Sequence, residues 1–334
     1  MRFLVSKSSV AYIVSAATLL VAVWLGVSIG TVKIPIQTFW DGTDTKASNI
    51  LWKIRMPRVV LAGLVGASLA ISGAAFQGLL KNPLADPYTL GVSSGASVGA
   101  VMTLFFGLSL PILGTYTLPT FSMIGAALTM FLVLGFARLV DRAMKMETII
   151  LTGIIFGSFL GSVLSLMIAL TGEELRQIIS WLLGSVSMRG WQYTMMILPF
   201  VFVGSLLLWL NRRELNAMLF GEERAHHLGV NVKRRKFMIL IGGSILTGSA
   251  VAVSGTIGFV GLVVPHMTRL MWGADHRHLL TLSFMNGASL LIICDLVART
   301  IISPSELPVG VITAFIGAPV FAYIFYRQRR KGAM

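Results

Sequence analysis

The chain consists of apolar stretches close to twenty residues long, separated by short loops that are charged or contain proline. About twenty apolar residues are needed for an α-helix to cross the ~30 Å hydrocarbon core of a bilayer. The 334 residues are 55% hydrophobic and 12% charged, whereas soluble globular chains carry about 25% charged residues. No soluble core could enclose this much apolar side chain. We therefore predict an all-α polytopic membrane protein with a single transmembrane domain over residues 1–334.

Two of the apolar stretches are too long for one ordinary crossing. Residues 90–140 contain Pro111, Gly114 and Pro119, which together predict a turn between two spans. Residues 237–272 could form one very long helix or two short ones, and the pattern of apolar residues does not decide between them. The charges of the neighbouring loops do decide.

Basic loops mark the cytoplasmic side of a membrane protein. Residues 233–236 read KRRK, and the tail over 327–331 is also strongly basic. Both should lie inside, which requires an even number of crossings between them. A break near Ser254-Gly255 supplies that number and places both termini in the cytoplasm. The ten predicted spans are residues 10–29, 59–80, 90–110, 120–140, 149–170, 193–210, 237–254, 256–272, 279–297 and 309–326.

A short internal repeat accompanies this count. Residues 66–73 read GASLAISG, and residues 248–255 read GSAVAVSG. The predicted spans that hold them run in opposite directions, so the repeat would be inverted, as in many transporters. Small residues also recur wherever membrane helices pack closely. Both interpretations stay open on the sequence alone.

Several classes of function lack support in the sequence. The net charge of +14 is spread over short loops and forms no continuous face for a nucleic acid. No GxxxxGK[ST] phosphate loop is present, and His226 and His227 are adjacent, so they cannot ligate a metal as an i, i+4 pair would. Asp295 precedes Arg299 by four residues, which favours an ion pair on one helix face over a proton relay. We expect no catalytic residue, cofactor or bound metal.

A series of motifs occurs in one fixed order along the chain. They are RMPR (55–58), QGLLKNPLADP (77–87), LGVSSG (90–95), SGTIGFVGLVVPH (254–266), CDLVAR (294–299) and ELPVG (306–310). Together they resemble the FecCD family, the permease subunits of ABC importers for iron–siderophore complexes, haem and vitamin B12. The resemblance implies ten helices per subunit, with helices two to five and seven to ten related by inversion.

The resemblance also implies two cytoplasmic sites. Asn82, Pro83 and Leu84 would form part of the inner gate of a pathway between two permease copies, although a plain tight turn would also explain the prolines. Residues 221–231 would form the helical loop that docks on the ATPase, although a solvated loop is the usual fate of such charged segments. The residues that match the family pattern there are Glu222, Glu223, Ala225, Leu228 and Gly229.

On the outer face the resemblance concerns three arginines. Arg55, Arg58 and Arg299 would face glutamates of an extracytoplasmic substrate-binding protein. A single arginine at a span end could instead reach out to lipid phosphate.

The function implied is that of a permease subunit in the cytoplasmic membrane of a prokaryote, carrying an iron–siderophore by alternating access. Its partners would be a second permease copy (the same chain or a paralogue), two ATP-binding-cassette ATPase subunits, the binding protein and membrane lipid. Permeases for vitamin B12 or haem are the first alternatives. An ion-coupled secondary carrier is a further one, although buried ionisable groups are scarce.

Overall fold

The computed structural model describes residues 7–30, 32 and 46–332, and these residues form helices and connecting turns without a β-strand. The helical elements, in chain order, are α1 (Lys7–Ser28), α2 (Lys46–Asn49), the π-helix η2 (Ile50–Arg55), α3 (Met56–Leu79), the 3₁₀-helix η3 (Pro87–Leu90), α4 (Val92–Phe105), the 3₁₀-helix η4 (Gly114–Tyr116), α5 (Thr117–Val140), α6 (Met146–Leu170), α7 (Leu175–Leu182), α8 (Trp191–Leu210), α9 (Arg212–Leu219), α10 (Glu222–His227), α11 (Val232–Ser254), α12 (Val260–Trp272), α13 (His276–Thr300) and α14 (Val309–Gly332).

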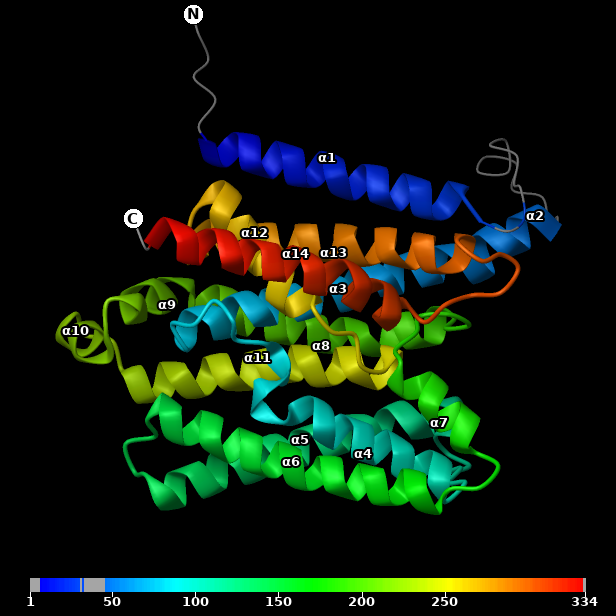
Figure 1. Cartoon of the computed structure of the whole chain (residues 1–334), viewed down its shortest axis with the longest axis horizontal. Coiled ribbons are helices and arrows are strands. Elements are labelled where there is room, and N and C mark those ends of the chain that lie inside the picture. Colours follow the sequence, from blue (N-terminus) through cyan, green and yellow to red (C-terminus); the bar gives the residue numbers. More distant parts are fainter. Residues whose placement is uncertain (1–6, 31, 33–45, 333–334) are drawn as a thin grey trace, which may run out of the picture.

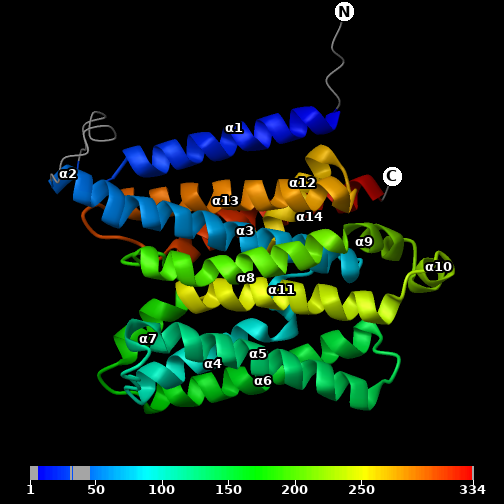
Figure 2. The ribbon, with the colours of Figure 1, turned by 180° about the vertical axis from the view of Figure 1, so that it is seen from behind.

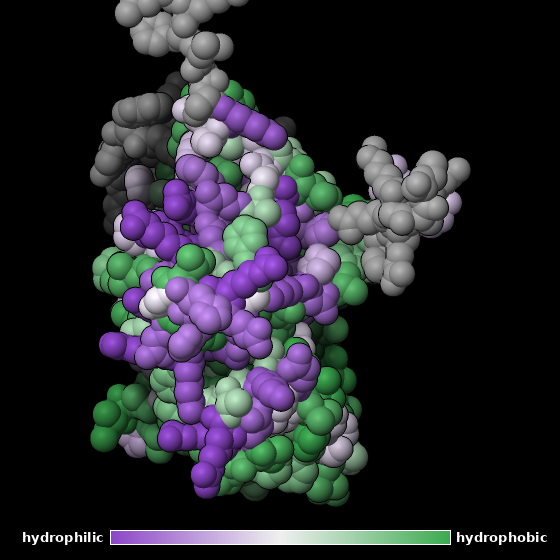
Figure 3. Space-filling model, turned by 90° about the vertical axis from the view of Figure 1, so that its left-hand side faces the viewer, coloured by the Kyte–Doolittle hydropathy of each residue, from purple (hydrophilic) through white to green (hydrophobic). Residues whose placement is uncertain are grey.

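The long helices run side by side and give the bundle two distinct ends (Figure 1). α1 and α11 begin at the end that carries α10, and α14 ends there, whereas α2 and α7 lie at the opposite end. We call these the α10 end and the α7 end. Hydrophilic side chains cover much of the α10 end (Figure 3). The basic segments that predict the cytoplasmic side therefore share one end, while the placement of that end inside the cell stays a prediction.

Seven helices of the described residues are long and apolar enough to cross a membrane. α4 has 14 residues and α12 has 13, so at 1.5 Å per residue each reaches only about 20 Å of the ~30 Å hydrocarbon core. The apolar part of α14, Val309–Ile324, is also short. Helix length alone thus supports seven crossings, and the count of ten stays a prediction.

α3 lies at the centre of the bundle. In the segment Lys46–Leu79, which contains α3, 83% of the most apolar 18-residue stretch is buried. It packs against α8, α11, α12 and α13. Gly66 of α3 and Gly287 of α13 meet backbone to backbone, because a Cβ atom at either would clash with the carbonyl oxygen of the other. Lipid tails are as apolar as leucine, so helices in a membrane associate through such close approaches. The close-packing interpretation of the residue 66–73 motif is therefore correct for Gly66.

The contacts of the two halves correspond to each other. α3 packs against α12 and α13, and α11 packs against α4 and α5. Figure 2 shows α3, α8 and α11 adjacent in the middle of the bundle, with α13 on one side and α5 on the other. The central helix of each half thus packs against two helices of the other half, as an inverted repeat of the two halves predicts.

Candidate functional site

The link between α3 and α4 begins with a tight turn toward the α10 end. The side-chain Oδ1 of Asn82 accepts a hydrogen bond of 2.9 Å from the backbone nitrogen of Leu84. The backbone nitrogen of Ala85 donates to the carbonyl oxygen of Asn82 at 3.1 Å. Asn82 and Leu84 are exposed, and Pro83 is partly buried. These three predicted gate residues thus form one solvent-facing turn, and their gating role stays a prediction.

The same link continues as η3 before α4 can begin. Asp86 caps η3 by accepting a hydrogen bond of 2.8 Å from the backbone nitrogen of Tyr88, and Thr89 closes the capping box. Gly91 then adopts a φ of +76°, a conformation that glycine takes without strain. α4 therefore starts about twelve residues after α3 ends and covers the α7-end side of the bundle (Figure 1).

α11 and α12 are joined by a second irregular segment, residues 255–259. Gly255 has a φ of +70°, and a Cβ atom there would clash with the carbonyl oxygen of Trp181. Phe259 has a φ of +68°, which is uncommon for a bulky residue, and its side chain lies against Gly317 of α14. α12 starts only after this segment and extends toward the α10 end (Figure 1).

The two irregular segments meet through Tyr88. The Tyr88 hydroxyl donates to the carbonyl oxygen of Ile257 at 2.8 Å and accepts from the Ile257 backbone nitrogen at 3.1 Å. Pro87 lies against Gly261, where a Cβ atom would come within 2.6 Å of the proline ring. We call residues 86–91 and 255–259 the junction. Paired interrupted spans in corresponding positions of two halves indicate the transport pathway of a carrier.

A buried ionic cluster lies near the α7 end, where α3 begins and α13 ends. Arg58 donates to Asp295 through Nε and Nη2, both at 2.9 Å, and to Glu306 through Nη1 at 2.8 Å. Arg299 lies 3.9 Å from the same aspartate. We call Arg58, Asp295, Arg299 and Glu306 the outer cluster. The expected pairing of Asp295 with Arg299 is present, but the hydrogen bonds from Arg58 are much shorter.

Arg55 is held separately, by the end of α1. Its guanidinium donates to the carbonyl oxygens of Val27 at 3.0 Å and Ser28 at 2.9 Å. Arg55 and Arg299 are each 4% exposed, and Arg58 is 8% exposed. The three predicted docking arginines thus bind groups of their own chain, and their contact with a binding protein stays a prediction.

Glu306 is the member of the outer cluster that reaches the surface, in the connection between α13 and α14. Burial would raise its pKa, but hydrogen bonds from Arg58 and Ser187 lower the pKa overall. In the sequence, Glu306 stands out only as part of the ELPVG motif, and no local pattern indicates a role for Tyr88 or Ile257. The local signals are an acid two residues before a proline for Glu306 and an aromatic residue after Asp-Pro for Tyr88, and neither identifies a partner so distant in the chain.

α9 and α10 form a small helical protrusion at the α10 end. Ala225 is the buried residue of α10, whereas Leu228, which follows that helix, is 71% exposed. Gly229 has a φ of +83°, and its backbone nitrogen caps α10 by donating to the His226 carbonyl oxygen at 2.9 Å. Glu222 forms an ion pair of 2.7 Å with Lys236 of α11, which ties the protrusion to a long helix.

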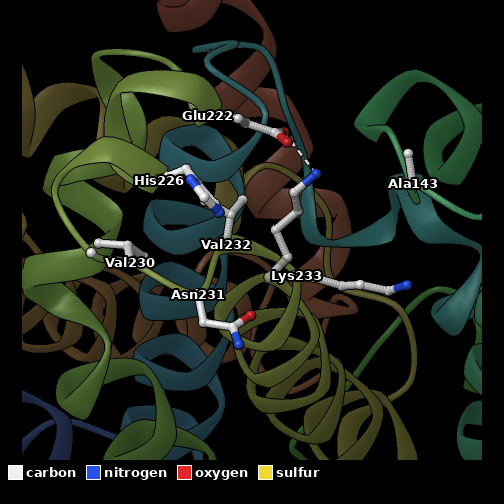
Figure 4. Close-up of a pocket in the computed structure, with 9 residues that line it drawn as sticks. Ala143, Glu222, His226, Val230, Asn231, Val232 and Lys233 are labelled. Carbon is white, nitrogen blue, oxygen red and sulfur yellow. Dashed lines mark ion pairs between the residues drawn. The ribbon is translucent and has the colours of Figure 1, made fainter.

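Figure 4 shows this ion pair beside a hollow of about 510 Å³ between α10 and the turn that contains Ala143. Glu222, Ala225 and Gly229 therefore fix the protrusion, and Leu228 and Glu223 face solvent from it. Within the described ranges, no group of three His, Cys, Asp or Glu side chains could hold a metal ion.

The sequence profile of the FecCD transport family matches residues 18–327. This chain belongs to the FecCD transport family. It is 60% identical to the Uncharacterized ABC transporter permease protein YvrB of Bacillus subtilis, with 96% of this chain and 95% of that protein covered. It is also 38% identical to the Hemin transport system permease protein HmuU of Yersinia pestis, with 94% of both chains covered. The Cobalamin import system permease protein BtuC of Halobacterium salinarum is 43% identical, over 88% of this chain and 77% of that protein.

A solved metal-chelate-type ABC transporter in an inward-facing conformation matches the fold with a TM-score of 0.84 at 31% identity, covering 94% of this chain and 98% of that one. PsaBC of Streptococcus pneumoniae matches with a TM-score of 0.59 at 16% identity, which shows a shared fold alone. This FecCD chain is therefore a multi-pass membrane permease subunit of an ABC transporter.

Proposed function

We propose that this FecCD subunit moves an intact metal chelate across the cytoplasmic membrane of a prokaryote by alternating access. The observation that carries the proposal is the junction, where two interrupted spans in corresponding positions are joined by the double hydrogen bond of Tyr88 to Ile257. Interrupted helices leave backbone that can line a pathway at the middle of the membrane. A second copy of this chain or of a paralogue would complete the pathway, with Asn82 and Leu84 at its inner opening.

An iron–siderophore is the first candidate for the cargo, and haem and vitamin B12 are the second. The names of two relatives, a hemin permease and a cobalamin permease, are the reason for keeping haem and vitamin B12 as alternatives. Retention of one chelate by the partner binding protein, measured by calorimetry with a ferric siderophore, haem and cobalamin in parallel, distinguishes these cargoes. Tight binding of a free metal ion instead of any chelate would contradict the proposal.

At the α7 end, the binding protein would dock over the outer cluster. Three buried arginines would support this surface from beneath, because they hold α1, α13 and Glu306 in place. They are Arg55, Arg58 and Arg299. Charge reversal of the buried arginines would disturb the fold. Glu306→Gln is the cleaner probe of docking, and it should change the rate of association with the binding protein at low ionic strength more than at high ionic strength.

At the α10 end, α10 would transmit the closure of the two ATPases. The side chain of Leu228 points outward at 71% exposure, so Leu228→Asp should leave the fold intact while weakening contact with an apolar cleft on the ATPase. We expect co-purification of the ATPase and substrate-stimulated ATP hydrolysis to fall at least about tenfold.

Arg277→Asp is the matched control, because Arg277 is an exposed residue at the same end outside α10. Full ATPase stimulation in Leu228→Asp would contradict the role of α10. An ion-coupled carrier is tested in the same vesicles: transport that stops with an ionophore but persists without ATP would favour that alternative.

A further inference from the structure

Two hollows lie next to each other on the outside of the bundle, and Phe131 lines both. The first, of about 190 Å³, is apolar and lies between α5, α8 and α11. The second, of about 590 Å³, lies closer to the α10 end and combines apolar with basic side chains. The residues lining the second hollow include Phe131, Leu134, Arg138, Lys233, Arg234 and Phe237. We call these two adjacent hollows, which share Phe131 as a lining residue, the groove.

The groove follows one face of each of two helices. On α5 its lining residues recur every three or four positions from Met123 to Arg138, and on α11 they do so from Arg234 to Gly248. Arg138 lies fifteen positions after Met123 in α5, which corresponds to about 22 Å along the helix. A bilayer with its headgroups is about 40–45 Å thick, so the groove is as long as one leaflet.

The wall of the groove inside the membrane offers no free polar group to a ligand. The Ser244 hydroxyl contacts the sulfur of Met130 at 3.2 Å, and the Ser249 hydroxyl donates to the Leu246 carbonyl oxygen at 3.1 Å. Phe131 and Phe200 are partly exposed and flank the opening. The surface presented there is apolar, which suits a hydrocarbon chain.

The groove ends in positive charge at the α10 end. Arg138 and Arg234 are exposed, and within the described part of the chain no acidic side chain forms an ion pair with either. Lys233 also lies there, with its Nζ donating to the Arg142 carbonyl oxygen at 3.0 Å. The neighbouring acid Glu222 is already paired with Lys236.

We propose that this groove binds one anionic diacyl phospholipid of the leaflet at the α10 end. Its phosphate would lie between Arg138, Lys233 and Arg234, and one acyl chain would lie along α5 and α11 past Phe131. Basic pockets between membrane helices on the cytoplasmic side are suited to acidic lipid headgroups. An apolar groove of one-leaflet length that ends at exposed arginines without an acidic partner matches an anionic lipid.

The contact between the basic residues and the lipid headgroup is tested with the full chain purified in a non-ionic detergent. Native mass spectrometry would compare binding of palmitoyl-oleoyl phosphatidylglycerol with that of phosphatidylcholine carrying the same chains. We expect a preference for phosphatidylglycerol in the wild type. Each arginine near an anionic headgroup adds to the free energy of lipid binding. The double variant Arg138→Gln with Arg234→Gln should therefore weaken phosphatidylglycerol binding roughly 30-fold.

Arg213→Gln with Arg277→Gln removes two exposed arginines from the same end outside the groove and is the matched control. It should change the affinity less than about threefold. Equal loss in both double variants, or equal binding of the two lipids by the wild type, would overturn the proposal, because either result indicates general attraction of lipid to the surface.

The binding of the acyl chain in the groove is tested separately. Ala127 is an exposed residue that lines the groove, so Ala127→Trp should fill it and weaken phosphatidylglycerol binding about tenfold. Leu128→Trp changes the adjacent residue of α5, which is 57% exposed and lies outside the lining, and should have no effect. Unchanged binding in Ala127→Trp would reduce the site to a headgroup contact and overturn the diacyl assignment.

Discussion

Tyr88 shows how much a single side chain contributes at the point where two helices are interrupted. Ile257 lies outside the regular helices, so its backbone groups have no helical partners, and its side chain is 1% exposed. One phenol hydroxyl supplies both the donor and the acceptor that Ile257 needs. Buried backbone groups without partners are rare in proteins.

We therefore expect Tyr88→Phe to destabilise the protein by about 1–3 kcal/mol, because it leaves the nitrogen and the oxygen of Ile257 unpaired. Thermal unfolding of the purified protein measures this loss. Tyr193→Phe serves as the control, since its hydroxyl makes one exposed hydrogen bond of 3.4 Å to Thr115. If both variants unfolded at the wild-type temperature, the junction would not depend on the hydroxyl.

The protonation of Glu306 should make the stability of the folded protein depend on pH. Its pKa is lowered from the ordinary value of 4.5, with burial opposed by the stronger combined effect of hydrogen bonds from Arg58 and Ser187. A group with a lowered folded-state pKa stabilises fully above its unfolded value, and that stability disappears as the pH falls through the folded value. Below pH 4.5 the wild-type melting temperature should fall more steeply than that of Glu306→Gln. Parallel curves for the two proteins would show that the carboxylate contributes nothing.

At the scale of whole helices, the contact between α3 and α13 depends on glycine at the crossing point. Gly66→Ala places a methyl group against the Gly287 carbonyl oxygen, so the two helices must separate. We expect a loss of about 1–3 kcal/mol from this overpacking. Gly161→Ala in α6 is the matched control, because nothing lies within 4 Å of its added methyl group. That control should be neutral or stabilising by up to about 1 kcal/mol, and an equal loss in both variants would contradict the close-approach argument.

The sequence predicted the long helices well because their apolar runs correspond directly to a membrane crossing. α11 was expected over residues 237–254 and spans Val232–Ser254. α4 and α12 were expected as full spans of residues 90–110 and 256–272, but they are only 14 and 13 residues long. Their starting points depend on Gly91 and on contacts between Tyr88 and Ile257, which are 169 residues apart in the chain. No local pattern contains that information.

The candidate sites were predictable to different degrees. The exposed turn at Asn82 and the protruding α10 follow from proline, glycine and charge, which act locally. The burial of Arg58 does not, because it depends on Asp295 and Glu306, which are supplied by distant segments. Arginines at a span end have the same local sequence whether they face solvent or a buried acid.

For the molecule as a whole, the two ends of the bundle are distinguished by charge. Cysteine at Lys233, at the α10 end, should resist an impermeant thiol reagent in intact cells, whereas cysteine at Lys46, at the α7 end, should react. The native Cys294 is 1% exposed and should give little background labelling. Permeabilised cells provide the positive control for Lys233→Cys. Labelling of that variant without permeabilisation would contradict the cytoplasmic assignment of the α10 end.

The shortness of α4 and α12 has a consequence for how the protein is made. A segment of 13 or 14 apolar residues is a weak signal for insertion while the chain is being synthesised. α4 can enter the bilayer as a hairpin with α5, since Gly99 of α4 and Phe121 of α5 are in close backbone contact. α12 emerges later, and its start is held by Tyr88 of the first half. We therefore expect the amino-terminal half to be in place before α12 is inserted, so that the order of the two halves along the chain becomes the order of assembly.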